Sequence, residues 1–206
     1  MHTPLVSKIR PLGFQWETLD PFLFCVHHED FFPKGNAALG PDPSNFEGRH
    51  MGQDFIVKDG FRMYHGSTVP GFPGHPHRGF ETVTIAYEGK VEHHDSAGGG
   101  GVIGQGDVQW MTAAKGILHK EYHEQNWSKK GGDFEMIQLW VNLPKAHKMT
   151  PPKYQELTAA NMPKVILPEA KGQVNIIAGD FNGTKGAATT FTPVNLFDMK
   201  LKAGSE

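Results

Sequence analysis

The sequence predicts an all-β protein built from short strands. Seven runs rich in β-branched and aromatic residues have the length of strands and follow one another at short intervals. The chain of 206 residues also contains 25 glycines and 15 prolines, which are spread along it rather than gathered in one tract. This composition favours many turns and few long helices. Short strands at such density are typical of a sandwich or a barrel.

Most of the predicted strands form an antiparallel meander in the middle of the chain. Glu88-Gly89 is a candidate tight turn within it, and residues 98–106 supply a looser, glycine-rich connection. Two further strands belong to a group of three expected near the end of the chain. The seven predicted strands are Glu81–Tyr87, Lys90–Asp95, Asp107–Thr112, Ile117–His123, Phe134–Leu143, Gln173–Ala178 and Leu196–Leu201.

Two regions have no regular pattern. Residues 27–60 mix proline, glycine and asparagine with isolated aromatic residues, which predicts a long ordered loop or arm. Residues 145–164 contain Pro151-Pro152 and leave room for at most two helical turns before Pro163. This second region is therefore expected to be a linker, with one domain at residues 1–145 and a linker with further strands at residues 146–206.

Charge and composition exclude several functions. The 20 basic and 22 acidic residues leave no strongly basic face for nucleic acid or anionic lipid. No apolar run approaches the ~20 residues needed to cross a bilayer, and the first residues lack the apolar stretch of a signal peptide, so we expect a cytoplasmic protein. Because Cys25 is the single cysteine, a metal site must use histidine and carboxylate, and there are 12 histidines.

Two ligand pairs with strand spacing predict a metal centre. His75 and His77 flank one proline, and His119 and Glu121 flank one lysine; in a strand, residues two apart point to the same side. Three imidazoles and a carboxylate suit Fe(II), Mn(II), Ni(II), Cu(II) or Zn(II) better than Ca(II) or Mg(II). Four ligands of an octahedral ion leave two positions open for catalysis, whereas zinc closed tetrahedrally by the same residues would be structural.

Other residues near these pairs have two possible roles. Glu81, four residues beyond His77, is a candidate hydrogen-bond acceptor for a ligand imidazole or a competing ligand, or else an ordinary strand residue. His93, His94 and His123 are expected at the surface. Of these, His123, two residues beyond Glu121, is the candidate to approach the metal site and to support a ligand by hydrogen bonding. Trp110 is expected in the core.

Three segments of the chain resemble the pirin family of the cupin superfamily. They are HPHRGFETVTIAYEG, GDVQWMTAAKGILHKE and QLWVNLPK. The resemblance implies a cupin double-stranded β-helix, or jelly-roll, barrel with His75, His77, His119 and Glu121 as the ligands of non-haem Fe(II). Some pirins are flavonol (quercetin) 2,3-dioxygenases, and others are metal-dependent co-regulators of transcription or of metabolic enzymes.

The resemblance also concerns the end of the chain. Pirins usually carry a second cupin barrel, so residues 146–206 are expected to be a linker and the start of an incomplete second barrel. Phe197, Met199 and Leu201 alternate with Asp198 and Lys200, which predicts an apolar strand face. Without a second barrel this face would be uncovered, and we therefore expect a homodimer.

Two functions follow from the resemblance. As an enzyme, the chain would bind a small aromatic substrate with vicinal hydroxyl and keto groups, together with dioxygen, and Glu121 would be both ligand and catalytic base. As an interaction protein, the oxidation state of the iron would alter the surface offered to a regulatory protein partner, without turnover.

Overall fold

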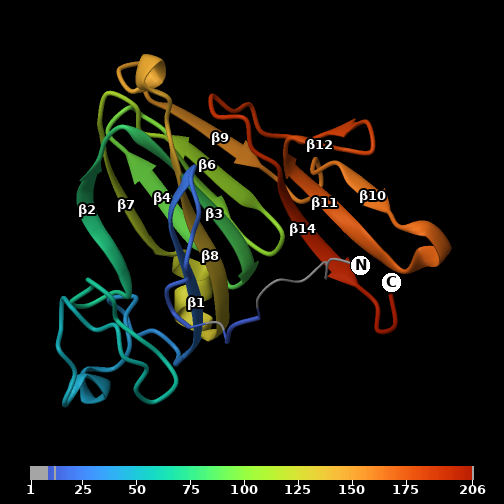
Figure 1. The fold of residues 1–206 in the computed structure, drawn as a ribbon. Coiled ribbons are helices and arrows are strands. Elements are labelled where there is room, and N and C mark those ends of the chain that lie inside the picture. Colours follow the sequence, from blue (N-terminus) through green and yellow to red (C-terminus); the bar gives the residue numbers. More distant parts are fainter. Residues whose placement is uncertain (1–8, 12, 206) are drawn as a thin grey trace.

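Two β-sheets face each other and enclose a barrel, and a smaller β lobe packs against the outside of one of them (Figure 1). The structure is a computed structural model, and it describes residues 9–11 and 13–205. The five-stranded sheet has the order β1 (Phe22–Phe32), β8 (Gly132–Asn142), β3 (Phe80–Glu88), β6 (Val108–Thr112) and β9 (Lys153–Leu157). The four-stranded sheet has the order β2 (Gly71–His77), β7 (Ile117–His123), β4 (Val91–Asp95) and β5 (Gly100–Ile103). The predicted all-β cupin fold class is confirmed.

Alternation along the strands separates two faces of the five-stranded sheet. On β3, Val83 and Ile85 point outward into a core shared with the C-terminal lobe, while Thr84 and Ala86 point into the barrel. The interior of the barrel is itself divided. One end holds an aromatic core, which includes Phe32, and the other end holds the polar residues described below.

The lobe that covers the outer face of the barrel is also made of strands. Ile177, Met162 and Val194 of this lobe pack against Trp110, which is fully buried, as expected. The lobe consists of a three-stranded sheet in the order β10 (Lys164–Ile166), β11 (Gly172–Ala178) and β14 (Leu196–Leu201), and of a small hairpin, β12 (Asp180–Phe181) and β13 (Thr184–Lys185).

Helical structure is limited to short segments. The α-helix α1 (Gln125–Lys130) begins after Glu124, whose carboxylate accepts hydrogen bonds from the backbone N–H groups of Asn126 and Trp127. None of the helices in the described part of the chain is long and apolar enough to cross a membrane. The remaining helical turns are the 3-10 segments η1 (Pro43–Phe46), η2 (Lys145–His147) and η3 (Pro168–Ala170).

All seven predicted strands are present, with boundaries within about two residues of those expected. The expected antiparallel meander, with a tight turn at Glu88-Gly89, was wrong, because β3 pairs with β6 and β8 while β4 pairs with β5 and β7 in the other sheet. At Gly89 the chain bends and passes from one sheet to the other. Gly89 has φ of 81°, a conformation that favours glycine, and a Cβ there would come within 2.7 Å of the Phe134 ring.

Three expectations about irregular segments were wrong. Residues 27–32 belong to β1 and not to a loop, because they pair along β8 from His27 opposite Ile137 to Phe32 opposite Gly132. The glycine-rich segment 98–106 contains β5, which is held by backbone pairing with β4. Within the expected linker, Lys153–Leu157 forms β9 at the edge of the five-stranded sheet, paired with β6. The division of the chain into domains at residue 145 stays a prediction.

Among the described residues, the last strand pairs with β11 on one side and lies at an edge of its sheet. Phe197 packs edge-to-face on Phe181, while Met199 and Leu201 are 48% and 58% exposed. The apolar pattern of β14 is thus partly covered within the lobe. The homodimer stays a prediction.

The contact between barrel and lobe leads to a prediction about stability. Replacing the fully buried Trp110 by alanine removes the largest side chain of the shared core, and we expect a loss of about 3–5 kcal/mol in the free energy of unfolding. Urea denaturation followed by circular dichroism measures this loss. Trp16→Ala is the control, because Trp16 lies outside the core clusters and should cost less. Equal losses for the two variants would contradict the assignment of Trp110 to the main core.

Candidate metal centre and its cavity

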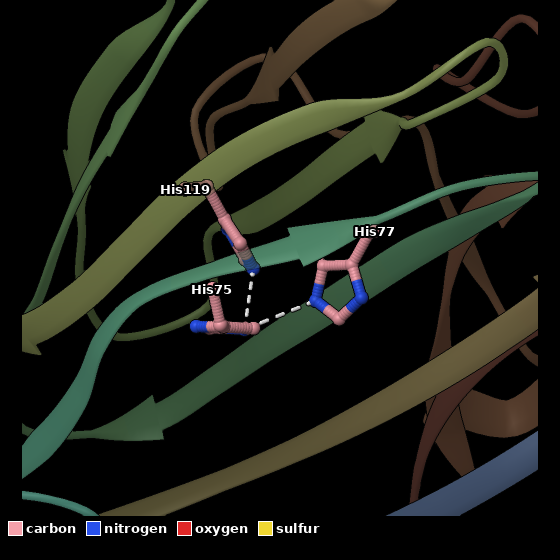
Figure 2. Close-up of side chains that lie close together, drawn as sticks. All are labelled: His75, His77 and His119. Atoms are coloured by element: carbon pink, nitrogen blue, oxygen red, sulfur yellow. Dashed lines mark hydrogen bonds between the residues drawn. The ribbon is translucent and has the colours of Figure 1, made fainter.

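Three imidazoles meet on the inner face of the four-stranded sheet (Figure 2). Antiparallel pairing of β2 and β7 sets His75 directly opposite His119, and His77 follows two residues later on the same strand. The Nε2 atom of His75 lies 2.9 Å from Nε2 of His119 and 3.1 Å from Nε2 of His77. His77 and His119 are buried, and His75 is half-buried.

Neighbouring groups determine which ring nitrogens carry hydrogen. Nδ1 of His75 lies 2.8 Å from the carbonyl oxygen of Pro73, which can only accept, so His75 donates there and the neutral ring keeps a lone pair on Nε2. Nε2 of His93 faces a carboxylate oxygen of Asp95 at 3.3 Å, so it donates and leaves Nδ1 as an acceptor. Nδ1 of His93 lies 3.2 Å from both Nδ1 of His119 and the amide nitrogen of Gln109, so these two donors share its single lone pair. With its hydrogen on Nδ1, His119 keeps a lone pair on Nε2.

These hydrogen bonds turn acceptor nitrogens toward one another. The lone pairs of His75 and His119 face each other at 2.9 Å, an arrangement that needs a cation or a shared proton between them. Burial and the neighbouring histidines lower the pKa of both His77 and His119 to about 3, so protonation at neutral pH is unfavourable. A transition-metal ion fits this donor set, because neutral imidazole nitrogen is a preferred ligand of such ions.

Glu121 lies next to this cluster and is buried. Its carboxylate accepts hydrogen bonds from the side-chain amides of Gln109, at 3.3 Å, and Gln138, at 3.1 Å. The amide of Gln138 is oriented by Trp140, whose indole N–H donates to the Gln138 oxygen at 3.2 Å. Glu121 forms a second group of potential ligands with His93 and His119, rather than with His75 and His77. The structure thus brings three of the four predicted ligands together and places the fourth beside His119.

A large cavity opens at the cluster. Its volume is about 740 Å³, and His75, His77 and Glu121 contribute to its lining. Phe80 and Trp140 stack on one side of it, with ring centroids 4.6 Å apart, and the Trp140 ring also packs against His77 at 5.3 Å. The other aromatic rings that line this cavity are those of Phe14, Phe24, Phe55 and Phe72. Mostly apolar walls with a few polar groups are typical of a small-molecule site.

The two residues predicted to support the ligands lie elsewhere. Glu81 points to the outer face of β3, where it accepts a hydrogen bond from Thr112 at 2.6 Å. Its spacing from His77 was misleading because the chain passes from one sheet to the other at Gly79, where φ is 83°. His123 does share the inner face of β7 with His119 and Glu121, but it packs at the aromatic end, 4.3 Å from the ring centroid of Phe32.

Burial overturns the expectation of surface positions for His93 and His123. His93 is fully buried, and His123 is 6% exposed, whereas the side chain of His94 is exposed, as expected. A usable signal was present in the sequence: Val91 is the apolar residue of its strand, and His93 and Asp95 follow at the inward-facing spacing of two. Gln109, Gln138 and Trp140 also belong to the site, and no local motif marks them.

The histidine cluster predicts how metal binding depends on His119. Wild-type protein should bind one transition-metal ion per chain, and His119→Ala should empty the site, because it removes the nitrogen that faces His75. Elemental analysis of protein purified without oxygen measures the stoichiometry. His94→Ala, on the outer face of β4, is the control and should retain the ion. The assignment is wrong if His119→Ala and wild-type protein carry the same amount of metal.

A second prediction concerns the hydrogen bond that orients His119. His93→Leu keeps all proposed ligands but removes the acceptor for Nδ1 of His119, and we expect metal affinity to fall by about 10- to 100-fold. Competition titration against a chelator measures this change. Asp95→Asn should have a smaller effect in the same direction, because it weakens the bond that fixes the His93 ring. Unchanged affinity in His93→Leu would show that the His93 contact has no orienting role.

The chain is similar to several known proteins. The family model described as Pirin matches residues 42–141. The "putative quercetin 2,3-dioxygenase" of Pseudomonas aeruginosa is 58% identical over 134 residues, which are 65% of this chain and 47% of that protein. Pirin-1 of Arabidopsis thaliana is 46% identical over 141 residues, which are 68% of this chain and 46% of that protein.

A solved structure also matches. The crystal structure of a quercetin 2,3-dioxygenase from Acinetobacter baumannii superposes with a TM-score of 0.71 at 43% identity, covering 91% of this chain and 55% of that one. The chain therefore spans about half the length of the relatives it matches.

Proposed function

Because the chain belongs to the pirin family, we propose that it is an iron-dependent dioxygenase that opens the heterocycle of flavonols such as quercetin. The observation that carries this proposal is the position of the histidine cluster, which lies at the wall of a cavity large enough for a small aromatic molecule. The family relationship narrows the reaction class, since two of the similar proteins are named for quercetin 2,3-dioxygenase.

His75, His77 and His119 would hold the iron, with Glu121 as the fourth ligand beside them. Bound Fe(II) would supply two open positions, either for the adjacent hydroxyl and keto oxygens of the substrate or for one substrate oxygen and dioxygen, and would lower the pKa of that hydroxyl. The stacked rings of Phe80 and Trp140 would orient the planar substrate and exclude water from it.

Glu121 would take the proton from the substrate hydroxyl. Its carboxylate lies on the cavity wall and accepts hydrogen bonds from two amide groups, so a proton acceptor is held in a fixed position there. Gln109 also donates to His93, so the base and the group that orients His119 share one amide. Proton transfer and metal binding would therefore depend on a common hydrogen-bond network.

Oxygen uptake tests the proposal. Iron-loaded protein should consume dioxygen in the presence of quercetin and release carbon monoxide. Glu121→Gln should retain part of its metal but lose the rate by about 100-fold or more, because both the charge and the candidate base are removed. Glu92→Gln, on the outer face of β4 where Glu92 contacts His94, is the matched control.

Two results would count against this function. If iron-replete protein shows no quercetin-dependent uptake above the rate of free iron, a regulatory role without turnover becomes the better explanation. Full activity of Glu121→Gln would instead leave the dioxygenase in place and remove Glu121 as its base.

A further inference from the structure

An imidazole from the opposite sheet lines the same cavity. His28 lies on the inward face of β1, in the five-stranded sheet, whereas the histidine cluster lies on β2 and β7. His28 is 1% exposed, and its Nδ1 atom has no hydrogen-bond partner among the residues that the structure describes. Buried polar groups are rarely left unpaired, because such a group loses its hydrogen bonds to water and gains none within the protein.

The groups that pack around His28 leave its Nδ1 atom without a polar partner. The rings of Phe14, Tyr64 and Phe72 pack around it, with centroids 5.2, 4.8 and 5.9 Å away. Tyr64 uses its hydroxyl elsewhere, as a donor to the carboxylate of Asp30. Packing against three aromatic rings fixes the orientation of the imidazole but gives its Nδ1 atom no hydrogen bond.

The buried ion pair nearby is complete without His28. Arg62 donates from Nε and Nη2 to the two carboxylate oxygens of Asp30, each at 2.9 Å, and also from Nη2 to the carbonyl oxygen of Glu29. Burial and the charge of Arg62 lower the pKa of His28 to about 3. The ring is therefore neutral at physiological pH and offers one N–H donor and one nitrogen acceptor.

Phe72 connects His28 to the histidine cluster. Its ring centroid lies 5.9 Å from that of His28 and 6.3 Å from that of His75, so both imidazoles pack against the same phenyl ring. A planar molecule that binds at the cluster and extends over Phe72 would bring its far end to His28. All three residues line the cavity.

We propose that His28 is a specificity-determining residue that hydrogen-bonds to a phenolic hydroxyl remote from the metal-binding end of the substrate. The cavity would then select polyhydroxylated flavonols over those that carry only the chelating hydroxyl and keto groups. This inference rests on the proposed function, since it takes the substrate class from there. The contact with His28 lies outside the reacting atoms and acts on binding.

Comparing two flavonols distinguishes the proposed hydrogen bond to His28 from chelation of the metal. Quercetin and 3-hydroxyflavone share the chelating pair, but 3-hydroxyflavone lacks the other hydroxyls. Dissociation constants are measured by fluorescence quenching of iron-loaded protein without oxygen, so that binding is read without turnover. Wild-type protein should bind quercetin about tenfold more tightly, because 3-hydroxyflavone leaves the buried imidazole unpaired.

Variants at His28 test the origin of that preference. His28→Phe should bring the ratio of the two dissociation constants close to one and leave the affinity for 3-hydroxyflavone and the metal content unchanged. His28→Gln, which retains a hydrogen-bonding group, should restore part of the ratio and provides a second variant if His28→Phe does not fold. His27→Phe is the matched control, because His27 is the adjacent residue on β1 and contacts Glu135 instead of the cavity.

The possible results distinguish the inference from the proposed function. Equal binding of the two flavonols by wild-type protein, or an unchanged ratio in both His28 variants, overturns the role of His28; a water molecule would then be the partner of its ring. Equal weakening of both compounds in His28→Phe overturns it as well. If wild-type protein binds neither flavonol, the substrate class itself is wrong.

Discussion

The 2.9 Å contact between Nε2 of His75 and Nε2 of His119 organises the interior of the barrel. In the tautomers assigned above, two acceptor nitrogens face each other at that distance, and antiparallel pairing places the two residues opposite each other. On one side, the carbonyl oxygen of Pro73 fixes the tautomer of His75, and on the other, Asp95 acts through His93 on His119. A transition-metal ion between these nitrogens would accept both lone pairs, which is why the cluster is a candidate metal centre.

The rest of the interior follows from that polar end. A buried carboxylate such as Glu121 is tolerated only with hydrogen-bond donors, and Gln109 and Gln138 supply them from the facing sheet. Trp140 in turn holds the Gln138 amide in place and also lines the cavity. The polar network and the aromatic wall therefore share residues.

Local patterns were sufficient for the central strands and for the two ligand pairs, His75 with His77 and His119 with Glu121, because strand alternation and spacing are local properties. The meeting of His75 with His119 depends on the pairing of β2 with β7. Local patterns failed for β9 and for the orientation of Glu81, which depend on how distant strands pair and on where the chain passes between sheets. The burial of His93 was readable from its spacing to Val91. The hydrogen bonds from Gln109 and Gln138 to Glu121 could not be predicted from the sequence. These two residues lie on strands of the five-stranded sheet, which faces β7 across the barrel.

The pairing of β1 with β8 has a consequence for the order of folding. These strands are separated by roughly one hundred residues along the chain, whereas β4 and β5 pair locally, and distant pairing carries the larger loop-closure cost. β1 supplies Phe24, Val26 and His28 to the cavity. The ligand strands can therefore assemble before the wall that faces them is in place, and during synthesis the ribosome must deliver β8 before β1 can dock. A nascent chain would expose its histidine cluster to solvent and to free metal ions until that late closure.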